Sequence, residues 1–158
     1  MIKLFFVLLL FPGPLFAGET FSARVVAVID GDTIDVVRGN ANLDQVRIRF
    51  YGIDAPESRQ PHGKKAAKHL QKILGSQLVQ VEVMQKRDKH KRIVGIVSHN
   101  SQDAGLAMAK DGYAWVDSRF CKRKSPCNSY RAAVNRAKKE KTGLWRDSNP
   151  VPPWKWRK

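Results

Sequence analysis

The sequence has few acidic residues, two cysteines and no long apolar segment after its first residues. Asp and Glu total 14 against 29 Lys and Arg in 158 residues, so the formal net charge is +15. This balance excludes an acidic protein and predicts a field that attracts polyanions, nucleic acid first and anionic membrane surfaces second. A basic surface can also serve solubility alone, so the charge needs support from phosphate-site residues.

The longest apolar run lies at the N-terminus, where residues 4–10 follow Lys3 and are broken by Pro12-Gly13-Pro14. The run is too short to span a bilayer as a stable anchor. With Ala17-Gly18 as a small-residue cleavage point, residues 1–17 are predicted to be a signal peptide, the alternative being a retained N-terminal anchor. We expect a secreted or periplasmic monomer without a stable membrane anchor, in which about 140 residues form one domain.

The cysteines, Cys121 and Cys127, stand close together in the sequence. Disulfides persist in exported proteins, so a bond between them is favoured, and it would close a small lysine-rich loop. Metal binding is the alternative, but no histidine pair accompanies them at the spacing of a zinc site.

Alternating apolar runs at residues 23–29 and 33–37 flank the sequence Asp30-Gly31-Asp32. Asp-Gly between two such runs predicts a hairpin, because glycine accepts the positive φ of a tight turn. Residues 46–51 alternate again, so Ile48 and its neighbours at even positions face a core while Arg49 faces the opposite side. Asp32 and Arg49 are thus expected at strand ends.

The chemistry at these strand ends combines carboxylates with an arginine. Asp30, Asp32 and Asp54 supply three carboxylates, whose oxygens suit a hard cation such as Ca²⁺ or Mg²⁺. An arginine such as Arg49 offers a planar fork that matches a phosphate, and a nearby glutamate, Glu57, can take a proton from water. Together they predict a phosphodiesterase site.

Three segments carry a resemblance to a known family: IDGDTIDV, RIRFYGIDAPES and Asp88-Lys89-His90-Lys91-Arg92. In this order they resemble the signatures of the staphylococcal nuclease (thermonuclease) family, over residues 21–145. The resemblance implies an α+β fold, a five-stranded OB-fold β-barrel with about three packed α-helices. It also implies Ca²⁺-dependent cleavage of DNA and RNA that leaves 3′-phosphate ends.

Residue by residue, the resemblance makes Asp32 and Asp54 ligands of one calcium ion, with Ala55 contributing its backbone carbonyl. It makes Glu57 the candidate base. The scissile phosphate would be held by Arg49 and Arg92. The chain departs from the family at Lys91, where a glycine is usual and where lysine adopts a positive φ less readily.

The remaining pattern predicts helices at residues 64–74, 100–111 and 128–141, the second capped by Asn100 or Ser101, and strands at 77–84 and 92–97. The nuclease domain is expected to span residues 18–147. Residues 148–158 are rich in proline, tryptophan and basic residues, and extended polyproline geometry or a disordered tail is expected. Four side chains are candidates for nucleic-acid contacts: Tyr113, Lys89, Trp154 and Trp156. An aromatic residue such as Tyr113 more often belongs to the core.

Two functions compete. The first is an exported, metal-dependent nuclease without strong sugar or sequence specificity. The second is a non-catalytic OB-fold nucleic-acid-binding protein, since such barrels bind single strands widely. The carboxylates of Asp32, Asp54 and Glu57 favour the enzyme, because they repel phosphate unless a cation bridges them to it. A cationic membrane-active protein would explain the charge but not these carboxylates.

Overall fold

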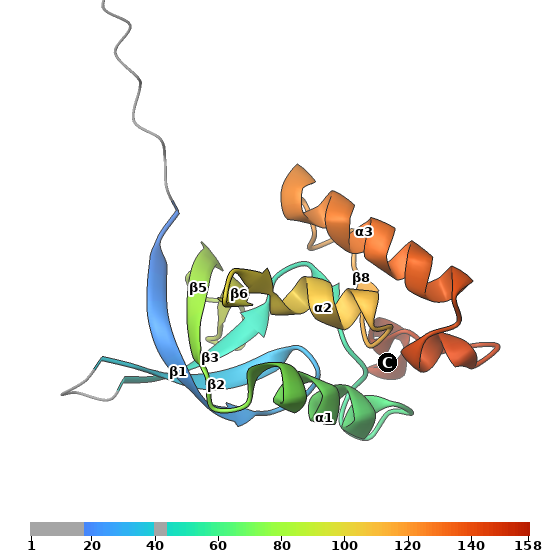
Figure 1. The fold of residues 1–158 in the computed structure, drawn as a ribbon, viewed down its shortest axis with the longest axis horizontal. Coiled ribbons are helices and arrows are strands. Elements are labelled where there is room, and N and C mark those ends of the chain that lie inside the picture. The colour runs from blue at the N-terminus through green and yellow to red at the C-terminus, as the bar shows by residue number, and fades with distance from the viewer. Residues whose placement is uncertain (1–17, 40–43) are drawn as a thin grey trace, which may run out of the picture.

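The central feature of the computed structural model is a closed β-barrel (Figure 1). The structure describes residues 18–39 and 44–158, so the predicted signal peptide lies outside the described residues. Antiparallel pairing runs in the order β3-β2-β1-β5-β6, and a parallel pairing of β3 with β6 closes the barrel. The barrel strands are β1 Thr20–Val28, β2 Thr33–Arg38, β3 Asp44–Phe50, β5 Leu78–Gln85 and β6 Ile93–His99.

Helices pack against the outside of the closed barrel, so the α+β OB-fold prediction is confirmed. None of the helices in the described part of the chain is long and apolar enough to cross a membrane. The short strands are β4 Ile53–Asp54, β7 Gln102–Asp103 and β8 Trp115–Val116, and β4 pairs with β8. The helices are α1 Gly63–Leu74, α2 Ala104–Lys110, α3 Lys124–Lys139, the 3₁₀ turn η1 Gly143–Arg146 and α4 Pro153–Trp156.

The N-terminal cap predicted for the second helix, α2, is wrong. Asn100 and Ser101 both have positive φ, 48° and 62°, in the turn between β6 and β7. The cap is Asp103, whose carboxylate accepts a hydrogen bond from the backbone N–H of Leu106 at 3.0 Å. An aspartate at this position satisfies a free backbone donor at the helix start, as serine would.

Two apolar clusters hold the molecule together. The larger fills the barrel and reaches under α1 and α2, where Ile34, Ile48 and Leu70 are fully buried. The smaller lies between α2, α3 and η1 and is centred on Leu144 and Trp145. The alternation of β3 follows the prediction, because its even-numbered side chains enter the barrel while Arg49 does not.

The C-terminal residues are not the extended or disordered tail expected from their composition. Pro153 is buried and begins α4, and Trp154 packs against the smaller cluster. Figure 1 places the C-terminal end beside the segment that links β3 to α1. The proline-rich sequence therefore forms part of the domain, because its apolar side chains pack against the smaller cluster and are removed from water.

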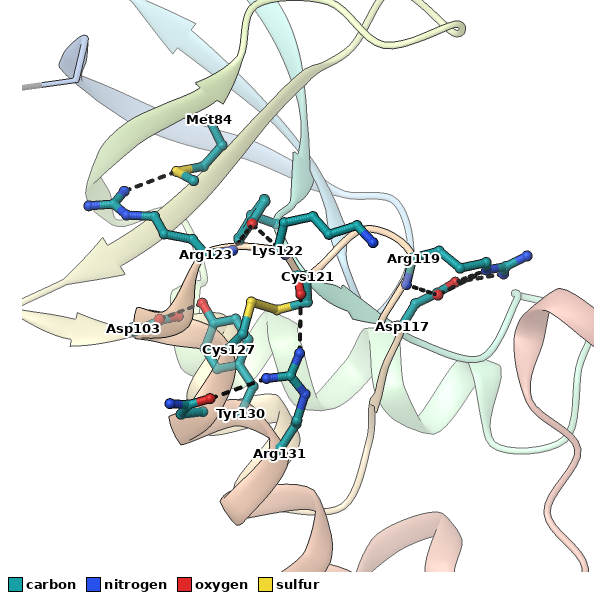
Figure 2. Close-up of a disulfide and its surroundings, with 12 residues drawn as sticks. Met84, Asp103, Asp117, Arg119, Cys121, Lys122, Arg123, Cys127, Tyr130 and Arg131 are labelled. Atoms are coloured by element: carbon teal, nitrogen blue, oxygen red, sulfur yellow. Dashed lines mark hydrogen bonds and ion pairs between the residues drawn. A yellow bond between two sulfur atoms is a disulfide. The ribbon is translucent and has the colours of Figure 1, made fainter.

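Cys121 and Cys127 form the predicted disulfide (Figure 2), which ties the segment before α3 to the N-terminal end of that helix. The bond lies against Gly52, where a Cβ atom would come within 2.4 Å of the Cys121 sulfur. Gly52 also has a φ of 75°, which favours glycine. The disulfide thus packs directly on the turn that leads from β3 into β4.

Reducing this disulfide should lower the free energy of unfolding by about 2 kcal/mol, because the bond closes a short loop and restricts the unfolded chain. Denaturant unfolding with and without reductant measures the difference. The Cys121→Ala/Cys127→Ala double variant is the control and should not respond to reductant. An unchanged midpoint for the reduced wild-type protein would show that the bond adds no stability.

Candidate active site

Asp32 sits at the corner between β1 and β2, held against the segment that follows β4. Its side chain accepts hydrogen bonds from the hydroxyl of Thr33, at 3.0 Å, and from the backbone N–H of Ala55. The neighbouring Gly31 does not have the positive φ expected for it. A Cβ atom there would lie 2.7 Å from Cβ of Ala55 and 2.8 Å from Cβ of Ala66, so the glycine is required by close packing.

Arg49 joins the two buried carboxylates of the site. Its Nη1 lies 3.1 Å from Oδ1 of Asp32, and its Nη2 donates to Oδ1 of Asp54 at 2.8 Å. The side chains of Asp32 and Asp54 are only 5% and 4% exposed, and that of Arg49 is 16% exposed. Further hydrogen bonds from Arg49 Nη1 to the carbonyls of Phe50 and Ile53 fix the direction of the guanidinium.

The pKa of Asp32 is changed by burial and by the charged groups around it. Burial raises the pKa of this carboxyl well above its ordinary value, and the negative charges of Asp30 and Asp54 add to the rise. The guanidinium of Arg49 acts in the opposite direction. A site that concentrates carboxylates out of water in this way gains stability from any further positive charge.

Glu57 follows β4 in a loop that is fixed at several points. Its backbone N–H donates to the side-chain oxygen of Gln60 at 3.1 Å, and its carbonyl accepts from the Gln60 N–H at 2.8 Å. The first residue of α1, Gly63, passes so close that a Cβ would lie 1.8 Å from the Glu57 carbonyl oxygen. The Glu57 side chain is 35% exposed and therefore remains open to solvent.

The next member of the site, Arg157, was not predicted from the sequence. Its Nη2 donates to Oδ2 of Asp54 at 2.7 Å, and its Nη1 bonds to Oδ1 of Asp54 at 3.2 Å and to Oε1 of Glu57. The hydrogen bonds that Arg157 donates, first those to Asp54 and then that to Glu57, raise the pKa of Arg157 above its ordinary value. The basic and aromatic pattern of residues 154–158 suggested nucleic-acid contacts, and nothing in it pointed to Asp54.

Arg92, by contrast, is engaged within its own turn. Its Nη2 and Nε bond to Oδ2 of Asp88 at 2.7 and 2.9 Å, and its backbone N–H bonds to Oδ1 at 3.0 Å. Lys91 takes the left-handed conformation, with a φ of 61°, so lysine has replaced the expected glycine without loss of the turn. In the part of the chain that the structure describes, the recorded partner of the Arg92 side chain is Asp88, not the carboxylates around Arg49.

The possible nucleic-acid contacts lie in different settings. Tyr113 is half-buried and stacks on His69, with ring centroids 4.6 Å apart. Trp154 is half-buried in the smaller cluster, 5.7 Å from the guanidinium of Arg119. Lys89 and Trp156 are exposed. Of the four side chains, these two therefore present the most surface to solvent.

The donors available for a cation are hard oxygens. Within residues 18–39 and 44–158, no group of three or more His, Cys, Asp or Glu side chains has the arrangement of a metal site. Asp32 and Asp54 nevertheless converge on one guanidinium, and the backbone of Ala55 lies against Asp32. Carboxylate oxygens such as these two are hard donors of the kind that Ca²⁺ binds.

Gln60 is a bridge that can be tested separately from the chemistry. It is 5% exposed, and while its oxygen holds the Glu57 loop its amide nitrogen donates to the carbonyl of Val151. Gln60→Glu replaces that donor with an anion facing a carbonyl and should lower the free energy of unfolding by about 1–3 kcal/mol. Urea unfolding measures this change in the free energy of unfolding. Faster cleavage by trypsin after Lys155 would show that the C-terminal segment is less firmly held.

The matched control is Gln71→Glu, which makes the same chemical change at an exposed position on α1. If Gln60→Glu were no less stable than Gln71→Glu, Gln60 would not tie the C-terminal segment to the Glu57 loop.

Comparison with known proteins shows the family of the chain. A family model described as "Staphylococcal nuclease homologue" matches residues 47–147. An "Uncharacterized endonuclease" of Escherichia coli is 35% identical over 152 residues, covering 96% of this chain and 94% of that protein. A "Micrococcal nuclease" of Shigella flexneri is 34% identical over 90% and 83% of the two chains, and the "Staphylococcal-like nuclease CAN1" of Arabidopsis thaliana is 38% identical over 71% and 33%. The chain therefore belongs to the staphylococcal nuclease family and is a nuclease of this type.

Proposed function

We propose that the protein is a Ca²⁺-dependent endonuclease that hydrolyses phosphodiester bonds of both DNA and RNA and acts as a monomer after export. The observation that carries the proposal is the pair of buried carboxylates, Asp32 and Asp54, joined by Arg49 beside the half-exposed Glu57. The Cys121–Cys127 disulfide supports export, because such bonds persist in oxidising compartments.

One calcium ion would be held by the carboxylates of Asp32 and Asp54 with the carbonyl of Ala55. When bound, the ion supplies positive charge for the phosphate and makes a coordinated water more acidic. The role of the protein is to place the attacking water opposite the leaving 5′-oxygen of the phosphate, with the proton acceptor beside that water.

Glu57 accepts the proton of the attacking water, whose oxygen forms the new bond to phosphorus while the bond to the 5′-oxygen breaks. The leaving 5′-oxygen takes up a proton, and the products carry 3′-phosphate and 5′-hydroxyl ends. As negative charge builds on the phosphate oxygens, the fork of Arg49 stabilises the transition state more than the substrate. The carbonyls of Phe50 and Ile53 keep that fork in place before substrate arrives.

The acidic residues separate this proposal from a protein that only binds nucleic acid. The net charge of +15 would serve either function. A pure binder gains nothing from carboxylates that face its anionic ligand, and burying them is costly. Their arrangement around one arginine has a use when a cation is bound there.

Plasmid DNA and single-stranded RNA should both be cut in Ca²⁺, and neither should be cut in chelator. Asp32→Ala and Asp54→Ala should each remove the Ca²⁺-dependent cleavage, because a hard cation needs both anionic ligands. Asp44→Ala, which changes an exposed carboxylate bonded to Arg38, is the control and should keep activity. Cleavage that persists in chelator would refute the metal assignment, and tight binding without cleavage would favour the binding protein.

Arg49→Lys should lower kcat by about 100-fold or more with a smaller effect on KM, because lysine keeps the charge but loses the fork. Steady-state kinetics at saturating Ca²⁺ measures both constants. Arg47→Lys is the matched control on the same strand, since Arg47 pairs with Asp35. Arg92→Lys should lower kcat less than Arg49→Lys does, because Asp88 holds Arg92. A change confined to KM for Arg49→Lys would indicate ordinary substrate binding.

A further inference from the structure

The C-terminal segment is anchored to the domain independently of Arg157. The carbonyl of Val151 accepts a hydrogen bond from the buried side chain of Gln60. Pro153 is buried at the start of α4, and Trp154 packs against the smaller apolar cluster close to the guanidinium of Arg119. Arg119 is in turn held by two-point pairing with Asp117. These contacts place the end of α4 at the active site whichever residue follows it.

Arg157 extends from this anchor and bridges the two carboxylates of β4 and the loop after it. It contacts both oxygens of Asp54 and one oxygen of Glu57. Its side chain is 46% exposed, whereas that of Arg49, on the other side of Asp54, is 16% exposed. The guanidinium of Arg157 therefore lies on the solvent side of the site, from which a polymeric substrate must approach.

The balance of charge shows why the site needs this residue. When ionised, Asp32, Asp54 and Glu57 carry three negative charges, and the two guanidinium groups in contact with them carry two positive charges. A divalent cation bound to the carboxylates would turn the net negative charge into a single positive one. That charge matches a phosphodiester monoanion. Without Arg157 the loaded site would be neutral and would attract phosphate less.

A cation on Asp54 would also change the position of Arg157. The positive ion competes with the guanidinium for the oxygens of Asp54 and repels it. Glu57 and the packed α4 would keep Arg157 within the site. The guanidinium of Arg157 could then bind the phosphate of a substrate in place of Asp54.

We propose that Arg157 is a further catalytic residue, which shares the scissile phosphate with Arg49 once a divalent cation occupies Asp54. The inference rests on the proposed Ca²⁺-dependent phosphodiester hydrolysis and names a residue of that same site. It assigns to the C-terminal segment an arginine fork that acts beside that of Arg49. The contact with Asp54 and Glu57 is then the resting position of that fork.

The test compares Arg157→Ala, Arg157→Lys and the control Lys158→Ala, which removes an exposed positive charge one residue away. Calorimetry with CaCl₂ alone measures cation affinity, and steady-state cleavage of single-stranded DNA at saturating Ca²⁺ measures kcat. Arg157→Ala should bind Ca²⁺ about fivefold more tightly, because it no longer competes for Asp54. Its kcat should nevertheless fall about 100-fold. Arg157→Lys should recover part of kcat, and Lys158→Ala should match the wild type in both measurements.

Tighter Ca²⁺ binding combined with slower turnover distinguishes a phosphate contact from other roles. Tighter binding with unchanged or faster turnover at saturating Ca²⁺ would make Arg157 an inhibitory plug and overturn the inference while leaving the proposed function intact. Weaker Ca²⁺ binding with an equal loss of activity in Arg157→Lys would show a merely structural role. A wild-type protein that does not cleave DNA in Ca²⁺ would overturn both proposals.

Discussion

The constraint on which the site depends is the burial of carboxylates beside one another. Asp32 and Asp54 lie almost fully out of water, and Glu57 follows in the next loop. Such groups are stable only when positive charge compensates them. Arg49 from the barrel and Arg157 from the far end of the chain provide it. The need for charge balance thus couples the β-barrel, the loop after β4 and the C-terminal helix.

Close backbone contacts make this arrangement possible. Gly31 lets the β1–β2 corner approach Ala55, Gly52 leaves room for the disulfide sulfur, and Gly63 allows α1 to start against the carbonyl of Glu57. At each position a side chain would push apart segments that carry site residues. The scaffold therefore fixes the carboxylates by steric fit, and the hydrogen bonds of Gln60 extend the same fixation to the C-terminal segment.

Much of the fold could be predicted from local patterns. Alternation in residues 46–51 indicated which side of β3 faces the barrel, and the three motifs indicated the OB-fold. The docking of residues 148–158 could not be predicted, because it depends on an apolar surface formed by α2, α3 and η1. For the same reason Arg157 was missed, since its partners stand about a hundred residues earlier in the sequence. The need for glycine at position 31 was predicted, but the reason is close packing against Ala55 and Ala66, not the expected positive φ.

The central claim is that the two buried carboxylates hold a cation and that two arginine forks then face the phosphate. A crystal structure with Ca²⁺ and a short oligonucleotide bearing an uncleavable linkage tests this most directly. The account predicts the ion in contact with Asp32, Asp54 and the carbonyl of Ala55, and the forks of Arg49 and Arg157 within hydrogen-bond distance of one phosphate. A phosphate held without these arginines, or an ion bound away from Asp32 and Asp54, would contradict it.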